Sequence, residues 1–218
     1  MQTELFLVRH GEPVLQNALL GSTDSPLSDA GWRQLETSCE HLPKLDFIVS
    51  SPLSRCANFA QQYAADKNLQ LHINPDWREC HFGDWDGCKY QQLHDEFPRE
   101  VENFFSRPDR HSPPKGEDLS GFCDRVESAL MQLIKTNPGK KIGVFSHAGV
   151  IRTLVAWCLK MDYASGLQFR RFAIDYASVT HLSIYTSDKH YPQLVSLNHH
   201  PVLNVQTRAD ATLAVETD

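Results

Sequence analysis

The sequence predicts an α/β fold, a three-layer sandwich in which a mostly parallel sheet carries helices on both faces. Short apolar runs typical of strands alternate along the chain with stretches of helical spacing. That alternation is typical of parallel sheets built from β-α-β units. With 218 residues, 41% of them hydrophobic, the chain is long enough to bury one sizeable core. We therefore expect a single domain over residues 1–218.

Six short runs are expected to form the strands. Each is apolar or rich in β-branched and aromatic residues, and turn-forming residues bound most of them. The last two runs are close enough in sequence to form a hairpin around Ser187-Asp188. The six runs are Glu4–Val8, Asp46–Val49, Leu71–Ile73, Lys141–Phe145, Val179–Tyr185 and Leu194–Leu197.

Four segments with helical spacing lie between these strands. Ser28 or Asp29 is expected to cap the first helix. Ser51 is expected to cap the second, with Pro52 in its first turn, a position that suits proline. The four segments are Asp29–Leu42, Pro52–Asp66, Glu117–Lys135 and Val150–Leu159.

Two parts of the chain depart from this alternation. Residues 79–116 are rich in charged residues, aromatic residues and proline, so we expect a lid-like insertion that lies over one end of the sheet. The tail from Gln206 has only a weak apolar pattern, and we expect it to be loosely attached.

Composition limits the classes of partner. The formal net charge is −6, whereas nucleic-acid binding requires a basic surface. No apolar run is long enough to cross a bilayer, and the start of the chain does not resemble a signal peptide. The six cysteines are scattered without a C-x-x-C pair, which favours reduced thiols. We expect a cytoplasmic protein without nucleic-acid or membrane partners; its oligomeric state is open, with a homodimer among the candidates.

Arginines and histidines gather where three predicted strands end. Arg9 and His10 follow the first strand, Arg55 lies near the start of the helix after the second, and His147 follows a later one. In open α/β sheets, ligands bind outside the carboxyl ends of the strands, so these side chains should share one crevice. Arginine binds phosphate oxygens through paired hydrogen bonds, and helix N-termini attract anions. The arrangement predicts a pocket for a phosphate dianion.

His10 is the expected nucleophile in this pocket. A histidine nitrogen attacks phosphorus only when it is unprotonated, and neighbouring cations such as Arg9 favour the neutral ring. Most of the other histidines have no motif around them, and we interpret them as structural or surface residues. Adjacent His199 and His200 would point to opposite faces of a strand, which disfavours a shared metal ion. With no nucleotide-binding glycine motif or metal-ligand cluster either, we expect no cofactor and no metal.

Five motifs, taken together, resemble the histidine phosphatase superfamily, which includes the cofactor-dependent phosphoglycerate mutases. Any one of them alone would be a weak signal, but they occur in the family's order and span most of the chain. They are Leu7-Val8-Arg9-His10-Gly11-Glu12; Asp24-Ser25-Pro26-Leu27-Ser28 with Gly31; Ser51-Pro52-Leu53-Ser54-Arg55; Glu79 followed by Phe82-Gly83-Asp84-Trp85-Asp86-Gly87; and Ser146-His147-Ala148-Gly149.

The resemblance implies catalytic roles for five matched residues. His10 would become the phosphohistidine, while Arg9, Arg55 and His147 would bind the phosphate oxygens. Glu79 would protonate the leaving oxygen and then deprotonate the water that hydrolyses the phosphoenzyme.

Three more residues are expected to bind substrate. Asn17 stands where members of the superfamily often have a phosphate-contacting asparagine. Ala148 belongs to the last motif, at a helix start. Glu117 lies in a run that resembles one bordering the substrate mouth in this family.

Some acidic and aromatic neighbours are given lesser roles. Glu12, Asp84 and Asp86 are the rivals of Glu79 as the acid, and Glu79 is favoured because the family-like block contains it. The aromatic residues after Glu79 are expected to be packing residues rather than platforms on which a ligand stacks. They are Phe82, Trp85 and Tyr90.

The resemblance implies a phosphoric monoester hydrolase that acts on a small phosphorylated metabolite. A phosphoglycerate mutase is a rival, disfavoured because mutase-like relatives tend to carry a longer insertion. A non-catalytic binding protein is another, disfavoured because all five catalytic positions are filled. Among phosphatases the whole pattern is most similar to the alpha-ribazole phosphatases of cobalamin biosynthesis. Fructose-2,6-bisphosphatase-like and broad-specificity sugar-phosphate phosphatases share the same core.

Overall fold

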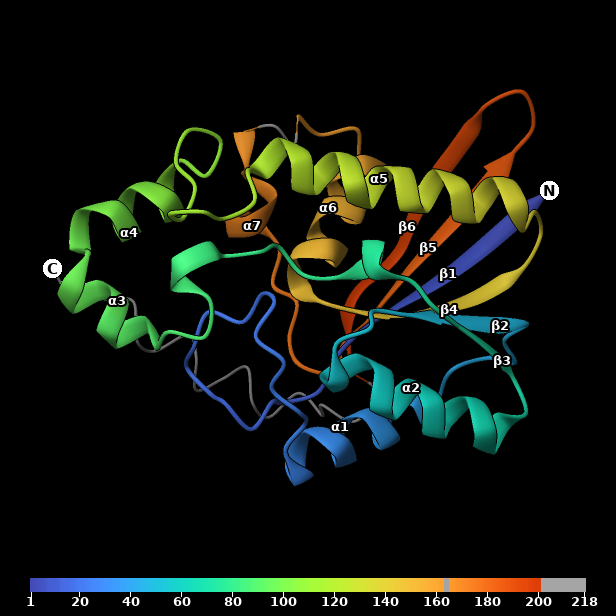
Figure 1. The fold of residues 1–218 in the computed structure, drawn as a ribbon. Coiled ribbons are helices and arrows are strands. Elements are labelled where there is room, and N and C mark those ends of the chain that lie inside the picture. Colours follow the sequence, from blue (N-terminus) through green and yellow to red (C-terminus); the bar gives the residue numbers. More distant parts are fainter. Residues whose placement is uncertain (163–164, 201–218) are drawn as a thin grey trace, which may run out of the picture.

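A six-stranded sheet lies at the centre of the protein, in the strand order β3-β2-β4-β1-β5-β6 (Figure 1). The structure is a computed structural model that describes residues 1–162 and 165–200, so the expectation for the tail from Gln206 lies outside the described residues. The strands are β1 (Gln2–Arg9), β2 (Phe47–Ser50), β3 (Gln70–Ile73), β4 (Lys141–Ser146), β5 (Val179–Thr186) and β6 (His190–His199).

The sheet is mixed, with its parallel part first in the chain. β3, β2, β4 and β1 run parallel to one another, whereas β5 is antiparallel to β1 and β6 is antiparallel to β5. The predicted hairpin around Ser187-Asp188 is confirmed. Each of the six predicted strands is present, and β6 extends further at both ends than the apolar run Leu194–Leu197 indicated.

Helices cover both faces of the sheet, as the fold class predicts (Figure 1). α1 and α2 pack against one face through a core that includes Leu35, Phe59 and Phe145. α5 and α6 pack against the other face through a second core that includes Phe122 and Leu154. These helices are α1 (Asp29–Glu40), α2 (Ser54–Lys67), α5 (Leu119–Thr136) and α6 (Ala148–Cys158).

The start of α2 differs from the prediction. Ser51 does not cap the helix and Pro52 precedes it, because α2 begins at Ser54 with Leu53 at its N-cap and no side-chain cap from that residue. The cap comes instead from a distant loop, since Asp24 Oδ1 accepts hydrogen bonds from the backbone N–H and the hydroxyl of Ser54, each 2.7 Å long. Neighbouring residues in the sequence could not reveal a cap supplied from thirty positions away.

Residues 79–116 form a helical segment beyond the end of the sheet (Figure 1). Its small core contains Trp85 and Leu93, together with Leu19 from the loop after β1. The elements of the segment are the 3-10 turn Gly83–Trp85, α3 (Tyr90–Glu96) and α4 (Pro98–Ser106).

A short helix later in the chain, α7 (Gln168–Arg171), was not predicted. Across the described residues, no helix combines the length and apolar character that a bilayer span requires.

The register of the central strands brings the two motif histidines together. β1 pairs with β4 so that Arg9 lies opposite Ser146. His10 and His147, each the next residue along its strand, therefore emerge side by side, with ring centroids 5.2 Å apart. The sheet itself thus positions the two rings.

Two glycines let the loop after β1 pass against the start of α1. A Cβ on Gly31 would lie 2.1 Å from the carbonyl oxygen of Glu12, and one on Gly11 would lie 2.0 Å from the carbonyl oxygen of Gly31. Both obstacles are backbone atoms, which cannot move aside as a side chain can. Gly31 therefore allows the start of α1 to pack against the backbone of the loop that follows His10.

We predict that Gly31→Ala lowers the free energy of unfolding by about 1–3 kcal/mol, because the added methyl group overlaps the backbone. Urea denaturation measures the change. Gly121→Ala is the matched control, since a Cβ there would meet nothing closer than 3.4 Å and alanine favours the helix by about 0.5–1 kcal/mol. Equal effects of the two substitutions would contradict the packing argument.

Candidate active site

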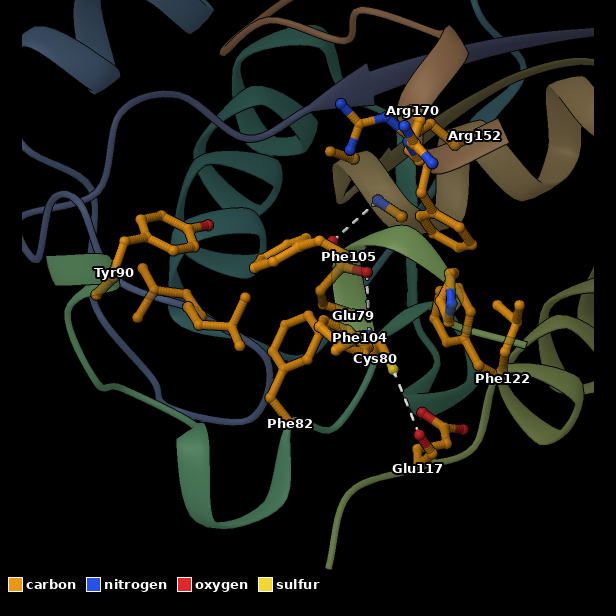
Figure 2. Close-up of a pocket in the computed structure, with 18 of the residues that line it drawn as sticks. Glu79, Cys80, Phe82, Tyr90, Phe104, Phe105, Glu117, Phe122, Arg152 and Arg170 are labelled. Carbon is orange, nitrogen blue, oxygen red and sulfur yellow. Dashed lines mark hydrogen bonds between the residues drawn. The ribbon is translucent and has the colours of Figure 1, made fainter. Parts of the chain in front are cut away.

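A cavity of about 290 Å³ opens beside His10, at the carboxyl end of β1 and the N-terminus of α6. Residues from the loop after β1, from the segment 79–116 and from α6 and α7 line it. Figure 2 shows Glu79 near the centre of this pocket, with Tyr90 on one side and Phe122 on the other. The predicted site residues on the cavity wall are Arg9, His10, Asn17, Glu79, Glu117 and Ala148.

One hydrogen bond fixes the tautomer of His10. Its Nδ1 lies 2.8 Å from the carbonyl oxygen of Gly11. A carbonyl oxygen can only accept, so Nδ1 carries the proton and donates it. In the neutral ring the lone pair is then on Nε2. His10 thus has the tautomer whose free nitrogen is available to a ligand in the cavity.

The surroundings of His10 keep its ring neutral. Only 6% of the residue is exposed, and burial lowers its pKa well below the usual value, with the charges of Arg9 and Arg55 acting in the same direction. The hydrogen bond to Gly11 opposes this effect without outweighing it. The ring therefore remains an uncharged nucleophile near neutral pH.

Arg9 is fixed at the cavity wall, and one of its hydrogen-bond donors has no partner among the described residues. Its Nη1 donates a 2.6 Å hydrogen bond to the carbonyl oxygen of Ile174, and its guanidinium lies 4.0 Å from the centre of the Tyr176 ring. Its Nε is buried and has no hydrogen-bond partner among the described residues. A buried unpaired donor is costly, so this guanidinium is well suited to an anionic ligand.

Arg55 and His147 lie behind the cavity rather than on its wall. Arg55 is fully buried and donates to the carbonyl oxygens of Leu20, Gly21 and Thr23. Its Nε also donates to Nδ1 of His147, 3.3 Å away. Most of its donors therefore hold the loop that precedes α1. The phosphate contact expected of Arg55 and His147 remains a prediction.

The contact with Arg55 also sets the tautomer of His147. Because Arg55 can only donate, Nδ1 of His147 accepts, and the proton of the neutral ring is on Nε2. Nε2 donates to the hydroxyl of Ser51, 2.8 Å away. Burial lowers the pKa of this ring well below the usual value, with Arg55 and His10 contributing. The two histidines are therefore both neutral and carry opposite tautomers.

Glu79 is anchored at the start of α6. Its Oε2 accepts from the backbone N–H of Gly149 at 2.9 Å, and its Oε1 accepts from the backbone N–H of Cys80 at 3.0 Å. A Cβ at position 149 would lie 2.2 Å from Oε1, so a larger residue there would displace the Glu79 carboxylate. Ala148, the first residue of α6, is also on the cavity wall. The contact between Gly149 and the Glu79 carboxylate explains why glycine is favoured at the end of the last motif.

Glu117 is engaged by protein groups. Arg125 donates to both of its carboxylate oxygens, at 3.0 and 2.8 Å, and the backbone N–H of His81 donates to Oε2. Arg125 also donates to the carbonyl oxygens of Arg78 and Glu79. This network fixes the backbone that carries Glu79, so the arrangement favours a positioning role for Glu117 over direct substrate binding.

Two tyrosines on the cavity wall were not predicted as site residues. Tyr90, interpreted from the sequence as a packing residue, is 46% exposed and lines the cavity, with its hydroxyl directed toward the centre in Figure 2. Its ring also packs against that of Phe105, with centroids 6.4 Å apart, so the sequence interpretation missed only its place on the cavity wall. Tyr176 stacks on Arg9 and lies in no motif, so only the three-dimensional contact reveals it. Asn17, as predicted, is on the wall, with a left-handed backbone at φ 55°.

Two further arginines on the wall were also missed. Arg152 lies one turn into α6, and its only hydrogen bond with a described residue runs from Nε to the carbonyl oxygen of Phe172. Arg170 belongs to α7, which the sequence did not predict. Arg152 lies five residues after His147 and Arg170 twenty-three residues after it. Neither belongs to a motif, so the sequence did not mark them as site residues. Across the described chain, no three His, Cys, Asp or Glu side chains are grouped to hold a metal ion.

Comparison with known proteins identifies the family. A model of the histidine phosphatase superfamily (branch 1) matches residues 5–199. The chain belongs to this superfamily. The predicted class of enzyme, a phosphoric monoester hydrolase, is thereby confirmed for this histidine phosphatase, and so is the predicted fold.

Three relatives illustrate the range of similarity. Phosphoglycerate mutase-like protein 4 of Arabidopsis thaliana is 35% identical over 158 residues, which cover 69% of each chain. Adenosylcobalamin/alpha-ribazole phosphatase of Salmonella typhimurium is 31% identical over 171 residues, or 76% of this chain and 84% of that protein. The crystal structure of the alpha-ribazole phosphatase from Shigella flexneri has a TM-score of 0.78 at 26% identity, covering 90% of this chain and 96% of that one.

We predict that the histidine phosphatase loses stability as the pH falls below about 6.5, the unfolded-state pKa of histidine. The folded pKa values of His10 and His147 are lower, so the unfolded state binds more protons in that range. Each ring then lowers the free energy of unfolding by up to about 1.4 kcal/mol for each unit by which the pH falls. Urea denaturation of wild type, His10→Gln and His147→Gln at pH 7 and pH 5 measures it. If the free energy of unfolding changed equally with pH in all three proteins, His10 and His147 would not be the groups with the lowered pKa.

Proposed function

We propose that this protein hydrolyses a small phosphomonoester through a phosphohistidine formed on Nε2 of His10. The observation that carries the proposal is the hydrogen bond from Nδ1 to the carbonyl oxygen of Gly11, which leaves Nε2 as the basic nitrogen beside a cavity with arginines on its wall. A neutral imidazole with a free Nε2 is the form that attacks phosphorus.

The reaction proceeds in two transfers. Nε2 of His10 attacks phosphorus while the P–O bond to the leaving alcohol breaks, and Glu79 supplies the proton that this oxygen gains. Arg9 neutralises the charge on the phosphoryl oxygens, the main contribution that a protein makes to phosphoryl transfer. Water then attacks the phosphohistidine, Glu79 takes its proton, and inorganic phosphate and free His10 are restored.

For the physiological substrate we propose alpha-ribazole 5'-phosphate as the first candidate. Relatives named as alpha-ribazole phosphatases, similar in sequence and in fold, support it, as does the match in overall motif pattern. Phosphoglycerate mutase activity and broad sugar-phosphate hydrolysis are the alternatives. Cytoplasmic location and a homodimeric state remain part of the proposal.

A substrate panel tests this candidate. We predict the highest kcat/KM for alpha-ribazole 5'-phosphate among compounds that include ribose 5-phosphate, fructose 2,6-bisphosphate and 3-phosphoglycerate, with phosphate release as the readout. Excess EDTA should leave the rate unchanged, because the proposed steps use only nitrogen, carboxylate and guanidinium groups. Isomerisation of phosphoglycerate without phosphate release would favour the mutase, and a loss of rate that added divalent ions restore would contradict the mechanism.

We predict that Glu79→Gln lowers the rate of phosphoryl transfer from an alkyl phosphate by about 10²–10⁴, the usual contribution of a general acid. The first step with p-nitrophenyl phosphate should change much less, because nitrophenolate leaves without a proton. Rapid-mixing kinetics separate nitrophenol release from phosphoenzyme breakdown. Breakdown should slow in its own right, because Glu79 also serves as the base for the attacking water. An equal loss in the first step for both substrates would instead point to Glu12 or Asp84.

A further inference from the structure

We propose that the cavity selects phosphomonoesters whose organic part ends in a planar aromatic group, and that Phe105 is the main residue that determines this specificity. The inference rests on the proposed phosphatase function and names the class of substrate for the same site. It follows from the side chains that surround the space left for the leaving group.

Aromatic rings make up much of the cavity wall away from His10. They come from three separate parts of the chain, namely the segment 79–116, α5 and α7. In Figure 2 several of these rings surround the open space around Glu79. Aromatic faces and edges attract another aromatic ring beyond the effect of buried area alone. The wall residues with such rings are Phe82, Tyr90, Phe104, Phe105, Phe122 and Phe169.

Phe105 presents an apolar ring to this space. It is 45% exposed although it lines the cavity, and no residue of α4 is buried. Its ring centroid is 5.1 Å from that of Phe104 and 6.4 Å from that of Tyr90. A ligand ring placed against these residues would cover apolar surface that now faces water, which is favourable.

The rings behind Phe105 are held in place. Phe104 packs edge-on against Trp85 and Phe82, with centroids 5.9 and 6.2 Å apart, and Trp85 is only 3% exposed. Elsewhere on the wall, the fully buried Phe122 lies 6.2 Å from Phe169. A wall whose residues are already ordered loses little conformational entropy on binding, which favours recognition of a rigid, flat group.

The phenylalanine rings themselves cannot replace the hydrogen bonds that a polar group makes with water. Hydroxyls of a sugar would give up hydrogen bonds with water against phenylalanine rings, which offer none in return. Glu117, a polar residue on the wall, already accepts hydrogen bonds at both oxygens from Arg125. Where these rings contact the substrate, an aromatic group is therefore favoured over a hydroxyl group.

Three alkyl phosphates with leaving groups of similar basicity test the inference: 2-phenylethyl phosphate, 2-cyclohexylethyl phosphate and ethyl phosphate. We expect kcat/KM for the phenyl compound to exceed that for the cyclohexyl compound about three- to tenfold. It should exceed that for ethyl phosphate by a factor on the order of fifty. Equal values for the phenyl and cyclohexyl compounds would overturn aromatic recognition.

Variants of Phe105 test whether this residue causes the preference for the phenyl compound. Phe105→Ala should reduce the ratio of phenyl to cyclohexyl kcat/KM to near one, and Phe105→Trp should restore it. Tyr191→Ala, which removes another half-exposed ring far along the chain on β6, should keep the wild-type ratio. A wild-type ratio in Phe105→Ala would overturn the role of Phe105, and the wild-type comparison still decides the substrate class if that variant fails to fold.

The two proposals fail in distinguishable ways. Hydrolysis of all three compounds with similar kcat/KM would overturn the inference and leave the phosphatase function standing. Failure to hydrolyse any phosphomonoester, with no phosphoenzyme formed, would overturn both.

Discussion

The hydrogen bond from Nδ1 of His10 to the carbonyl oxygen of Gly11 is the interaction on which the chemistry of this site depends. It assigns the ring proton to one nitrogen and leaves the other free, while burial and the nearby arginines keep the ring uncharged. The carbonyl group that accepts this bond belongs to a stretch of backbone that is tightly packed, since Gly11 and Gly31 pass closer than side chains would allow.

Around that nucleophile, the protein keeps its cations and its carboxylate in place with backbone groups. Arg9 is held by a carbonyl oxygen next to Tyr176, and Arg55 by three carbonyl oxygens of the loop before α1. Glu79 is held by two backbone N–H groups, that of Gly149 at the start of α6 and that of Cys80. Because these partners are fixed before substrate arrives, little reorganisation is needed when charge develops on phosphorus.

The sequence was sufficient to predict the strands and the four main helices. The strand ends also predicted that Arg9, His10, Arg55 and His147 would meet, and the structure places Arg9 and His10 on the cavity wall with Arg55 and His147 behind it. The sequence could not predict features made by distant contacts. Asp24 caps α2 from another loop, Tyr176 reaches Arg9 from outside every motif, and Tyr90 lies on the cavity wall. The ion pair of Glu117 with Arg125 likewise depends on tertiary structure, so its positioning role could not be read from neighbouring residues.

The state of the His10 ring tests the account most directly. Long-range proton–nitrogen correlation NMR on the ¹⁵N-labelled protein distinguishes the two tautomers and the charged ring. We expect a neutral ring at pH 7, with the proton on Nδ1 and a bare Nε2. A proton on Nε2, or a doubly protonated ring at that pH, would contradict that expectation.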